Sequence, residues 1–309
     1  MVGDRRGSGE NRRLHSLGMV AARLQVSLLE PAARPDVIAL FDREFIFSRG
    51  RTISLAQRFS DIFSSGDCFV AAGKLEDQLV SALTVRAFTW VDGEREWRGA
   101  MIGLVCTKLQ YRGRGYAGQL LTAAEGHCRA LGHDFAVLWA ANPAIYQALG
   151  WIAADRGMLG TRRMPSGGAP PDPSATHETP IFRIHALHEA RGSPRVRRQL
   201  ANYRHLLPPA ERLLFFLEGN SFALGGQHGR AGYVYELAGH CADMPRLWNS
   251  VAANFDDFYV NVERDSTAHC WLRTHTPLEW KAQALTMWKS MRSDRVPFQR
   301  WYIPVMDRI

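Results

Sequence analysis

The chain has 309 residues, 46% of them hydrophobic, and carries a formal net charge of +8. This length suffices for one large domain or two ordinary ones, and the hydrophobic content excludes a chain that is disordered throughout. The positive charge suits an anionic partner such as nucleic acid, a membrane surface or a phosphorylated cofactor. Much of the positive charge lies in short arginine runs, which a solvated surface also explains.

The first residues and the cysteines bear on the compartment. Residues 1–20 are polar and arginine-rich, without the apolar core of a secretory signal, so we expect a disordered leader. No segment approaches the roughly 20 apolar residues of a membrane span. The five cysteines are widely spaced and form no C-x-x-C pair, which disfavours a disulfide framework or a zinc site. We therefore expect a cytoplasmic protein with reduced thiols and no metal.

A mixed α/β domain is predicted for residues 21–164. Strands are expected at residues 24–30, 68–73, 78–90, 97–107 and 134–140, with another beginning at Trp151. Helices are expected at residues 36–47, 53–63, 115–131 and 144–149. Gly132 and Gly150 follow two of these helices and suit the positions where helices end.

Residues 165–180 contain five prolines and no periodic apolar pattern, which predicts a linker before a second domain at 181–309. The second domain repeats features of the first. The segments that begin at Arg58 and Arg212 both predict a helix, a polar turn, a strand ending in glycine and a second strand. Residues 186–200 likewise share a strand-to-helix pattern with residues 28–41. We favour an internal duplication over chance similarity.

A glycine-rich loop, YRGRGYAG, separates the strand at 97–107 from the helix at 115–131. Gly113, Gly115 and Gly118 permit backbone angles and close approach that side chains would block. The unpaired N–H groups at a helix N-terminus carry the positive end of the helix dipole and attract phosphate. Arg112 and Arg114 add positive charge. The loop therefore predicts an anion site.

Several kinds of site share this pattern. Residues 113–118 have the G-x-G-x-x-G spacing of a dinucleotide site, but at least three strands precede them and no acidic residue ends the next strand. A P-loop would need G-K-[ST], which is missing from this loop. A nucleic-acid loop would need aromatic platforms or a reading helix, and Tyr116 alone is weak support.

The segment Gln110–Gly115 resembles the Q/R-x-x-G-x-G/A signature of the GNAT acetyltransferase superfamily. The resemblance extends over residues 24–151 and includes the spaced Asn142, Tyr146 and Gly150-Trp151. It implies an α/β GNAT fold, with a central mixed, mostly antiparallel sheet flanked by helices. With the duplication, it also implies a degenerate second GNAT-like lobe over residues 181–309.

The resemblance implies a site for acetyl-CoA as cosubstrate. Its pyrophosphate would be held mainly through the backbone of Arg112, Gly113, Arg114, Gly115, Tyr116, Ala117, Gly118 and Gln119. Its pantetheine arm would pair with Val105, Cys106 and Thr107 in a splay between this strand and residues 135–140. The Thr107 N–H would polarise the thioester carbonyl. Asn142 would face the arm, or cap the helix that begins at Pro143, or do both.

Tyr146 is the expected catalytic residue, because a neutral phenol can give a proton to the leaving sulfur. Its structural alternative is a buried core tyrosine. The general base is open: Glu94 and Glu96 fit a solvated turn better, and His127 and His133 are expected at the surface. Cys106 as an acyl-accepting nucleophile is disfavoured against simple packing.

The second lobe lacks the glycine signature, because only CADM separates its strand from its helix, so one cofactor site per chain is predicted. Its many aromatic residues, Tyr302 among them, are expected in the core, with some lining a cleft between the lobes. The tandem arrangement resembles the enhanced-intracellular-survival type of acetyltransferase, in which the C-terminal carboxylate, here Ile309, would serve as base. That type has a third domain, for which this chain is too short.

We therefore expect an N-acetyltransferase acting by direct transfer on a primary amine of an unidentified small molecule or peptide. The alternative is a catalytically silent acyl-CoA-binding regulatory module. An amine substrate is the expected partner, with no nucleic acid and no membrane, and a homo-oligomer is left open. The +8 charge argues against polycationic acceptors.

Overall fold

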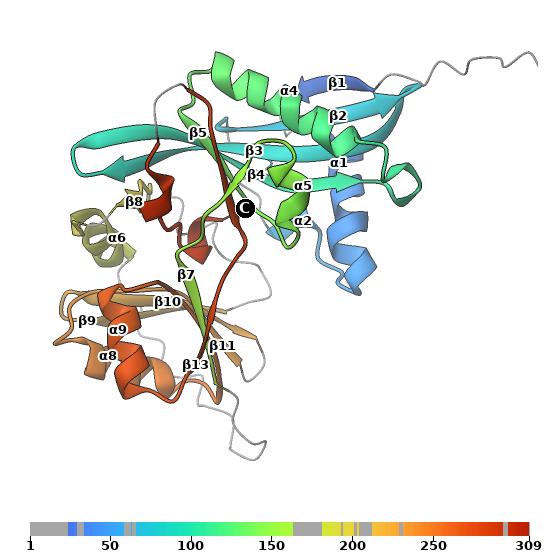
Figure 1. Cartoon of the computed structure of the whole chain (residues 1–309). Coiled ribbons are helices and arrows are strands. Elements are labelled where there is room, and N and C mark those ends of the chain that lie inside the picture. Colours follow the sequence, from blue (N-terminus) through green and yellow to red (C-terminus); the bar gives the residue numbers. More distant parts are fainter. Residues whose placement is uncertain are drawn as a thin grey trace, which may run out of the picture.

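Two β-sheets, each with its own helices, organise the computed structural model, which describes residues 24–29, 34–58, 63, 66–162, 181–192, 194–200, 203, 212–228, 231–292 and 296–308. Figure 1 shows the first sheet above the second, with the last part of the chain between them. The first sheet has the strand order β1-β2-β3-β4-β5-β14-β6, with β8 on β3, and the second has the order β13-β7-β12-β11-β10-β9.

The strands of the first sheet are β1 (Gln25–Leu29), β2 (Cys68–Leu75), β3 (Gln78–Asp92), β4 (Arg95–Thr107), β5 (Phe135–Trp139), β6 (Ile152–Ala153), β8 (Arg195–Val196) and β14 (Thr286–Ser290). Those of the second are β7 (Gly157–Arg162), β9 (Arg212–Glu218), β10 (Ser221–His228), β11 (Ala231–Ala238), β12 (Asp257–Glu263) and β13 (Glu279–Ala282). All neighbouring pairs are antiparallel except β4–β5 and β11–β12, as the predicted mixed, mostly antiparallel sheet requires.

The helices are α1 (Pro35–Phe41), α2 (Leu55–Arg58), α4 (Tyr116–Ala130), α5 (Pro143–Gln147), α6 (Ile181–Ala190), α8 (Met244–Ala252) and α9 (Thr267–His275). The π-helical turn η2 (Asp42–Ile46) continues α1, and the 3₁₀ turns are η3 (Phe47–Arg49), η4 (Leu109–Tyr111), η5 (Phe298–Arg300) and η6 (Val305–Asp307). None of these helices is long and apolar enough to cross a bilayer.

Helix α4 covers one face of the first sheet because its apolar residues recur at helical spacing. Leu120, Leu121, Ala124 and Cys128 are buried and pack on strand residues of that face. Gly132 follows the helix with φ +76°, a left-handed conformation that glycine adopts without a Cβ penalty. In Figure 1, α4 lies above the sheet and α1 below it, so the sheet is covered on both sides.

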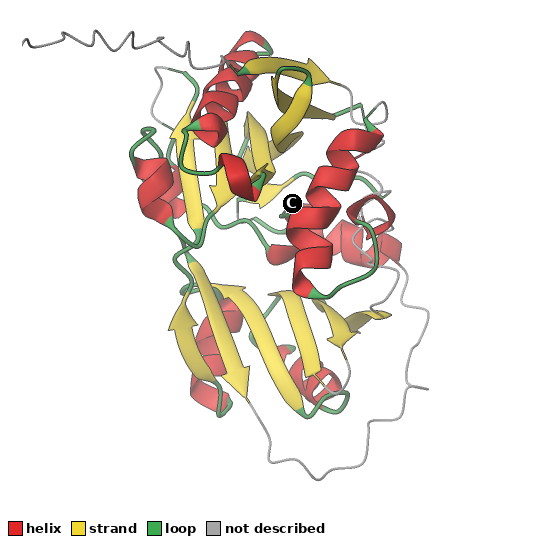
Figure 2. Cartoon of the chain, turned by 90° about the vertical axis from the view of Figure 1, so that its right-hand side faces the viewer, coloured by secondary structure: helices red, strands yellow, loops and turns green. Residues whose placement is uncertain are grey.

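The second lobe repeats the element order of the first. Strands β9, β10 and β11 form an antiparallel series, α8 follows, and β12 returns parallel to β11, as β2, β3, β4, α4 and β5 do. Figure 2 shows the strands of this second sheet with helices behind them. The repeat agrees with the predicted duplication.

The predicted secondary structure of two segments in this repeat is wrong. Residues 212–217 form strand β9 rather than a helix, because they close a hairpin on β10 through the turn at Gly219. Residues 181–190 form helix α6, where the repeat required a strand at 186, because Ile184 and His188 are buried four residues apart on one helix face. The short strand β8 follows α6 instead of preceding it.

The two lobes exchange strands. β6 and β7 are consecutive in the chain, yet β6 pairs with β14 in the first sheet and β7 lies between β13 and β12 in the second. β13 and β14 are also consecutive in the chain, but β13 belongs to the second sheet and β14 to the first. The Asp155 carboxylate holds the crossing: one oxygen accepts from the amide of Gly157 at 2.7 Å, the other from those of Leu285 and Thr286 at 3.0 Å.

Sheet membership therefore differs from the predicted division of the chain. β7 precedes the predicted linker but completes the second sheet, and β14 follows it but completes the first. The linker at 165–180 and the leader at 1–20 lie outside the described residues. Each lobe needs a strand from the other to continue its sheet, so the domain boundaries 21–164 and 181–309 remain a proposal about sequence organisation.

Candidate active site

The strands β4 and β5 form an opening at the centre of the first sheet. They pair only through Gly99↔Phe135, Ala100↔Ala136 and Met101↔Val137. Beyond Met101 the ladder stops, although β4 continues to Thr107 and β5 to Trp139. The predicted splay is therefore present between the strand that leads into the glycine loop and residues 135–140.

A β-bulge turns the last part of β4. Thr84 on β3 lies opposite Gly103, but Ala82 lies opposite Cys106, so the register between the two strands shifts by one residue. Leu104 within the bulge has φ +50°, a left-handed conformation that costs a residue with a side chain about 1–2 kcal/mol. The bulge re-aims Val105 to Thr107, which are the residues predicted to receive the cofactor arm.

Hydrogen bonds fix the end of β4. The Ser81 hydroxyl donates to the carbonyl of Cys106 at 2.7 Å and lies 2.8 Å from the Thr107 hydroxyl. The Arg112 Nε donates to the carbonyl of Thr107 at 3.0 Å, and its Nη2 is 2.6 Å from the carboxylate of Glu44. These contacts tie the start of the loop to η2 and keep the end of β4 rigid beside the opening.

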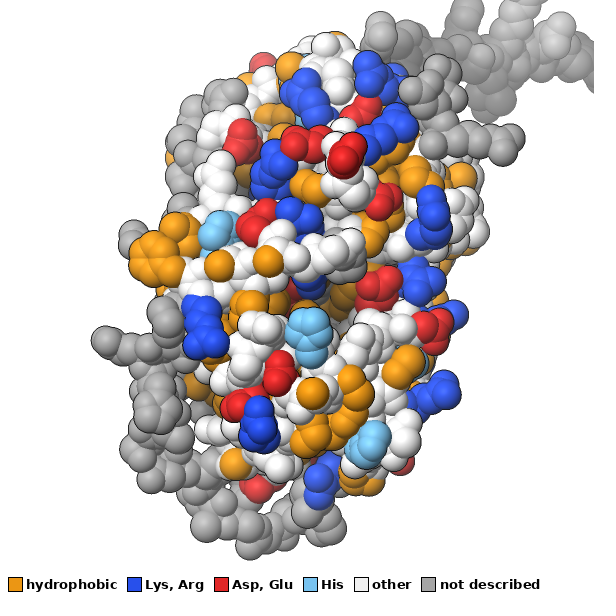
Figure 3. All heavy atoms as spheres, turned by 90° about the vertical axis from the view of Figure 1, so that its left-hand side faces the viewer, with side chains coloured by type: hydrophobic (Ala, Val, Ile, Leu, Met, Phe, Trp, Pro, Cys, Tyr) orange, Lys and Arg blue, Asp and Glu red, His pale blue; other side chains and the backbone are white. Residues whose placement is uncertain are grey.

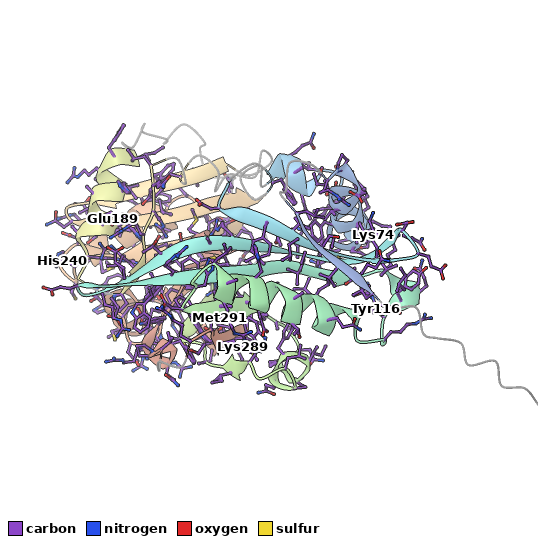
Figure 4. The ribbon with its side chains drawn as sticks, turned by 90° about the horizontal axis from the view of Figure 1, so that it is seen from above. Lys74, Tyr116, Glu189, His240, Lys289 and Met291 are labelled. Atoms are coloured by element: carbon purple, nitrogen blue, oxygen red, sulfur yellow. The ribbon has the colours of Figure 1, made fainter. Side chains whose placement is uncertain are left out.

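The glycine loop leaves an open, uncapped helix start. Gly113 and Gly115 have φ of +74° and +77°, and a Cβ on either glycine would meet no atom within 4 Å. Gly115 is the N-cap residue of α4 and no side chain caps the helix. The first N–H groups of an α-helix have no partner within the helix. Figure 4 shows Tyr116 at the end of α4 where the helix begins.

The side chains of the loop have separate functions. The guanidinium of Arg112 donates to Glu44 and Thr107 through Nη2 and Nε, which fixes its position beside the loop. Arg114 is exposed and lies over the ring of Tyr111, with 5.6 Å to the centroid. A Cβ on Gly118 would lie 3.7 Å from the Leu149 side chain, an ordinary contact, so the packing of α4 against the residues after α5 does not require a glycine there.

Helix α5 carries Tyr146 on the same core cluster as Leu138 of β5 and Val105 of β4. The Tyr146 ring is partly buried, packs on the core beneath α4 and meets Trp151 edge-on at 6.4 Å between centroids. Burial raises the pKa of the phenol above its ordinary value of 10.0, so it stays protonated at neutral pH. Asn142 precedes the helix and is exposed, but its side chain makes no capping hydrogen bond. Asn142 therefore occupies the predicted N-cap position of α5 without a capping hydrogen bond from its side chain.

A buried carboxylate supports this corner. Glu125 of α4 is 3% exposed and accepts from the indole N–H of Trp151 at 3.0 Å. Lys289 of the exchanged strand β14 donates to the same carboxylate at 2.7 Å and to the carbonyl of Leu149 at 2.6 Å. Figure 4 shows Lys289 beside α4. The second lobe thus contributes a cation that positions the segment carrying Tyr146.

The other candidates for chemistry either are unreactive, as Cys106 is, or lie far from the opening. Burial, with a smaller effect from Glu44, raises the pKa of the Cys106 thiol to about 12, so the reactive thiolate is scarce at neutral pH. Glu96 pairs with Arg197 at 2.6 Å on the β3–β4 hairpin, roughly eleven strand residues or about 35 Å from Thr107. Glu94 is exposed in the same turn.

The two histidines differ. His127 is half-buried on α4, with its ring 4.9 Å from that of Phe69. His133, predicted at the surface, is instead 3% exposed. It follows the turn that ends α4, where its Nδ1 lies 3.0 Å from the carbonyl of Cys128, and burial lowers its pKa. Neither histidine lies beside the opening.

Sequence reasoning missed two features of this site. The sequence does not single out Glu44, because one carboxylate in a predicted helix is common. Only the fold places it next to Arg112. Lys289 belongs to a segment far beyond α5 in the chain, and no local pattern assigns it to the first sheet. The described residues contain no group of three or more His, Cys, Asp or Glu side chains that could hold a metal ion.

Residues 25–154 match the family described as the acetyltransferase (GNAT) domain. Residues 25–154 therefore form a GNAT acetyltransferase domain. The family implies transfer of an acyl group from an acyl-CoA, and its fold typically binds acetyl-CoA. The uncapped glycine turn, the splay and the bulge at Leu104 suit such a ligand: open amides for a diphosphate and a gap between strands for a thin arm.

Solved structures show the same fold over both lobes. A GCN5-related N-acetyltransferase from Kribbella flavida is 18% identical with a TM-score of 0.63, over 86% of this chain and 71% of that one. One from Anabaena variabilis ATCC 29413 is 14% identical with a TM-score of 0.65, over 87% and 73%. A tandem GNAT protein of the clavulanic acid biosynthesis pathway is 11% identical with a TM-score of 0.56, over 88% and 100%. No curated protein sequence matches this chain.

Proposed function

We propose that this GNAT protein transfers an acetyl group from acetyl-CoA to a primary amine by direct transfer. The proposal is carried by one arrangement: an uncapped helix start behind two left-handed glycines, next to the opening between β4 and β5. Acetyl-CoA, when bound, supplies the thioester acyl group. Residues 112–119 would hold its diphosphate through backbone amides, and Val105, Cys106, Thr107 and Asn142 would line its arm.

Tyr146 would act as the general acid. The leaving thiolate needs a proton, and a buried phenol keeps its proton at neutral pH. The backbone N–H of Thr107 would polarise the acyl carbonyl, a role that benefits from the rigid anchoring of this strand end by Ser81 and Arg112. The acceptor amine must be neutral to attack. A side-chain base remains unassigned, and Ile309, the candidate carboxylate, lies outside the described residues.

The second candidate is a silent acyl-CoA-binding module. It shares the loop and the opening, and differs only in lacking turnover. The partly buried Tyr146, on the core cluster that it shares with Val105 of β4 and Leu138 of β5, favours the enzyme, because a binding module gains nothing from a protonated phenol there. We propose one acetyl-CoA site per chain, since the turn before α8 contains no counterpart of the glycine signature.

A thiol-release assay over a panel of amines tests the function. With acetyl-CoA as donor, we expect release of CoA that depends on an added primary amine and on enzyme concentration. Acetyl-CoA binding without release for any amine would select the silent module instead. Hydrolysis that is independent of the amine would contradict both.

The pH profile of turnover follows from the state of Tyr146. We expect kcat/KM to rise with pH as the acceptor amine loses its proton. The rate should not fall before about pH 10, because a raised phenol pKa keeps the proton donor intact to higher pH. A basic limb with an apparent pKa below about 9 in the wild-type protein would contradict this role for Tyr146.

The remaining expectations stay proposals: a cytoplasmic protein that acts on an amine without engaging nucleic acid or membranes. On the face drawn in Figure 3, blue and red side chains intermingle instead of forming a uniformly basic surface. The described residues of this face therefore form no continuous basic track for a phosphate backbone.

A further inference from the structure

Three buried hydrogen-bond donors without partners gather where the last residues of the chain meet the end of β5. They are the indole Nε1 of Trp139, the hydroxyl of Tyr302 and the Nη2 of Arg308. The guanidinium carbon of Arg308 lies 5.3 Å from the ring centroid of Trp139 and 5.7 Å from that of Tyr302. Most buried polar groups in folded proteins have a partner, so three such atoms around one cation require an explanation.

The other nitrogens of Arg308 are used. Its Nε donates to the carbonyl of Ile303 at 3.1 Å, and its Nη1 donates to Gln283 at 3.0 Å. Gln283 in turn donates to Asn261 at 2.7 Å. The side chain is therefore held in place by fixed partners while Nη2 keeps its donor capacity. Burial lowers the pKa of Arg308 but leaves so basic a group charged.

The carboxylates near Arg308 attract its charge but accept no hydrogen bond from its Nη2. Asp155 accepts from the amides of Gly157, Leu285 and Thr286, as described for the crossing between the lobes. Asp307 accepts from Arg198 through both oxygens, at 2.8 and 2.6 Å. Both carboxylates accept hydrogen bonds from other donors. The donors of Trp139, Tyr302 and Arg308 therefore have no acceptor among the described residues.

The cluster adjoins the opening on the face opposite α4. Trp139 is the last residue of β5, just beyond Val137, where pairing with β4 ends. Leu138 belongs to the core beneath α4, whereas Trp139 packs against the cluster that includes Trp301 and Ile303. The glycine turn and α4 lie on one side of the sheet, so an acceptor that enters from the other side would pass Trp139.

The chemistry of the cluster selects one kind of group. An indole N–H and a guanidinium N–H can only donate, and the phenol can donate as well. Together they suit the oxygens of a carboxylate and disfavour an ammonium group beside the fixed cation. We propose that Trp139, Tyr302 and Arg308 bind a carboxylate of the acceptor, so that the substrate is an amine that also carries a carboxylate, as an amino acid does. This inference rests on the proposed function.

Acceptor amines that differ only in whether they carry a free carboxylate test this proposal. The standard L-amino acids are offered as free acids and as α-amides to the full-length wild-type protein with acetyl-CoA, alongside spermidine and kanamycin as carboxylate-free amines. We expect at least one free acid to exceed its own amide by about 10- to 100-fold in kcat/KM, the range for a charge-assisted hydrogen bond. Turnover confined to amides, spermidine or kanamycin, or no turnover of any free acid, would overturn the inference.

Substitutions in the cluster test whether Trp139 and Arg308 cause the preference for the free acid over the amide. Arg308→Gln should bring the acid-to-amide ratio close to one, and Trp139→Phe, which keeps a ring and removes one N–H, should lower it about threefold to tenfold. Arg300→Gln, at an exposed arginine of the same terminal segment, should leave the ratio intact. If Arg308→Gln does not fold, the Trp139→Phe variant tests the proposal alone. An acid-to-amide ratio in Trp139→Phe equal to that of the wild type would overturn the inference. Calorimetry with acetyl-CoA on the same samples reports separately on the proposed function.

Discussion

Replacing Tyr146 by phenylalanine should lower kcat for acetyl transfer by about 10²- to 10⁴-fold, the usual contribution of a positioned general acid. The KM for acetyl-CoA should change little, because the ring stays in its contact with Trp151 and only the hydroxyl is lost. Steady-state thiol release with a saturating amine measures both parameters. The stability of the variant should stay close to that of the wild type.

Tyr259→Phe provides the matched control. Tyr259 stacks on Tyr233 in the second sheet, 4.7 Å between centroids, and removing its hydroxyl should leave kcat unchanged. If Tyr146→Phe retained kcat within about threefold of the wild type, well short of a general acid's contribution, Tyr146 would be a packing residue and the proton would reach the sulfur by another route.

Replacing Arg198 by methionine should destabilise the protein by about 3–5 kcal/mol, the cost of leaving buried charges without their partner. Arg198 is 3% exposed and joins Asp307 of the terminal segment to Glu236 of β11, each at 2.6 Å. Burial alone would raise the pKa of Glu236, but Arg198 and Arg191 hold it below its ordinary value. Without Arg198, two buried carboxylates lose their main counter-charge.

Urea denaturation monitored by tryptophan fluorescence measures this effect, and the neighbouring arginine is its control. Arg197 forms an exposed pair with Glu96, so Arg197→Met should cost no more than about 1 kcal/mol. Equal effects of the two substitutions would show that the buried network does not hold the terminal segment and β11 together.

The local features of the site could be predicted from the sequence, because each depends on neighbouring residues. Gly113 and Gly115 adopt the left-handed angles that the loop required, and α4 begins directly after them. The alternation and length of the strands at 78–90 and 97–107 located β3 and β4 within a few residues. Tyr146 lies on the helix that its spacing from Pro143 predicted.

The strand exchange could not be predicted, because a local pattern identifies a strand without naming its partner. Residues 157–162 and 286–290 are short strands whose pairing partners include segments far away along the chain. The same limit hid the donor cluster. Trp139, Tyr302 and Arg308 come from distant segments, and their unpaired atoms exist only after the lobes have folded together.

Segments with ambiguous periodicity account for the remaining errors. Residues 212–217 are apolar at most positions, so neither helical nor strand spacing stands out, and their hairpin with β10 decides the outcome. His133 looked like a surface residue after a helix. Its burial follows from the return of the chain into β5 directly after Gly132.

Calorimetric titration of CoA into the purified chain tests the central claim, that the backbone amides before α4 bind the diphosphate. We expect one CoA per chain, binding at least about tenfold weaker in Gly115→Val, whose side chain would enter the open turn at φ +77°. Gly126→Val, in the middle of α4 and exposed, should bind CoA as the wild type does. No heat of binding, or undiminished affinity in Gly115→Val, would contradict the account.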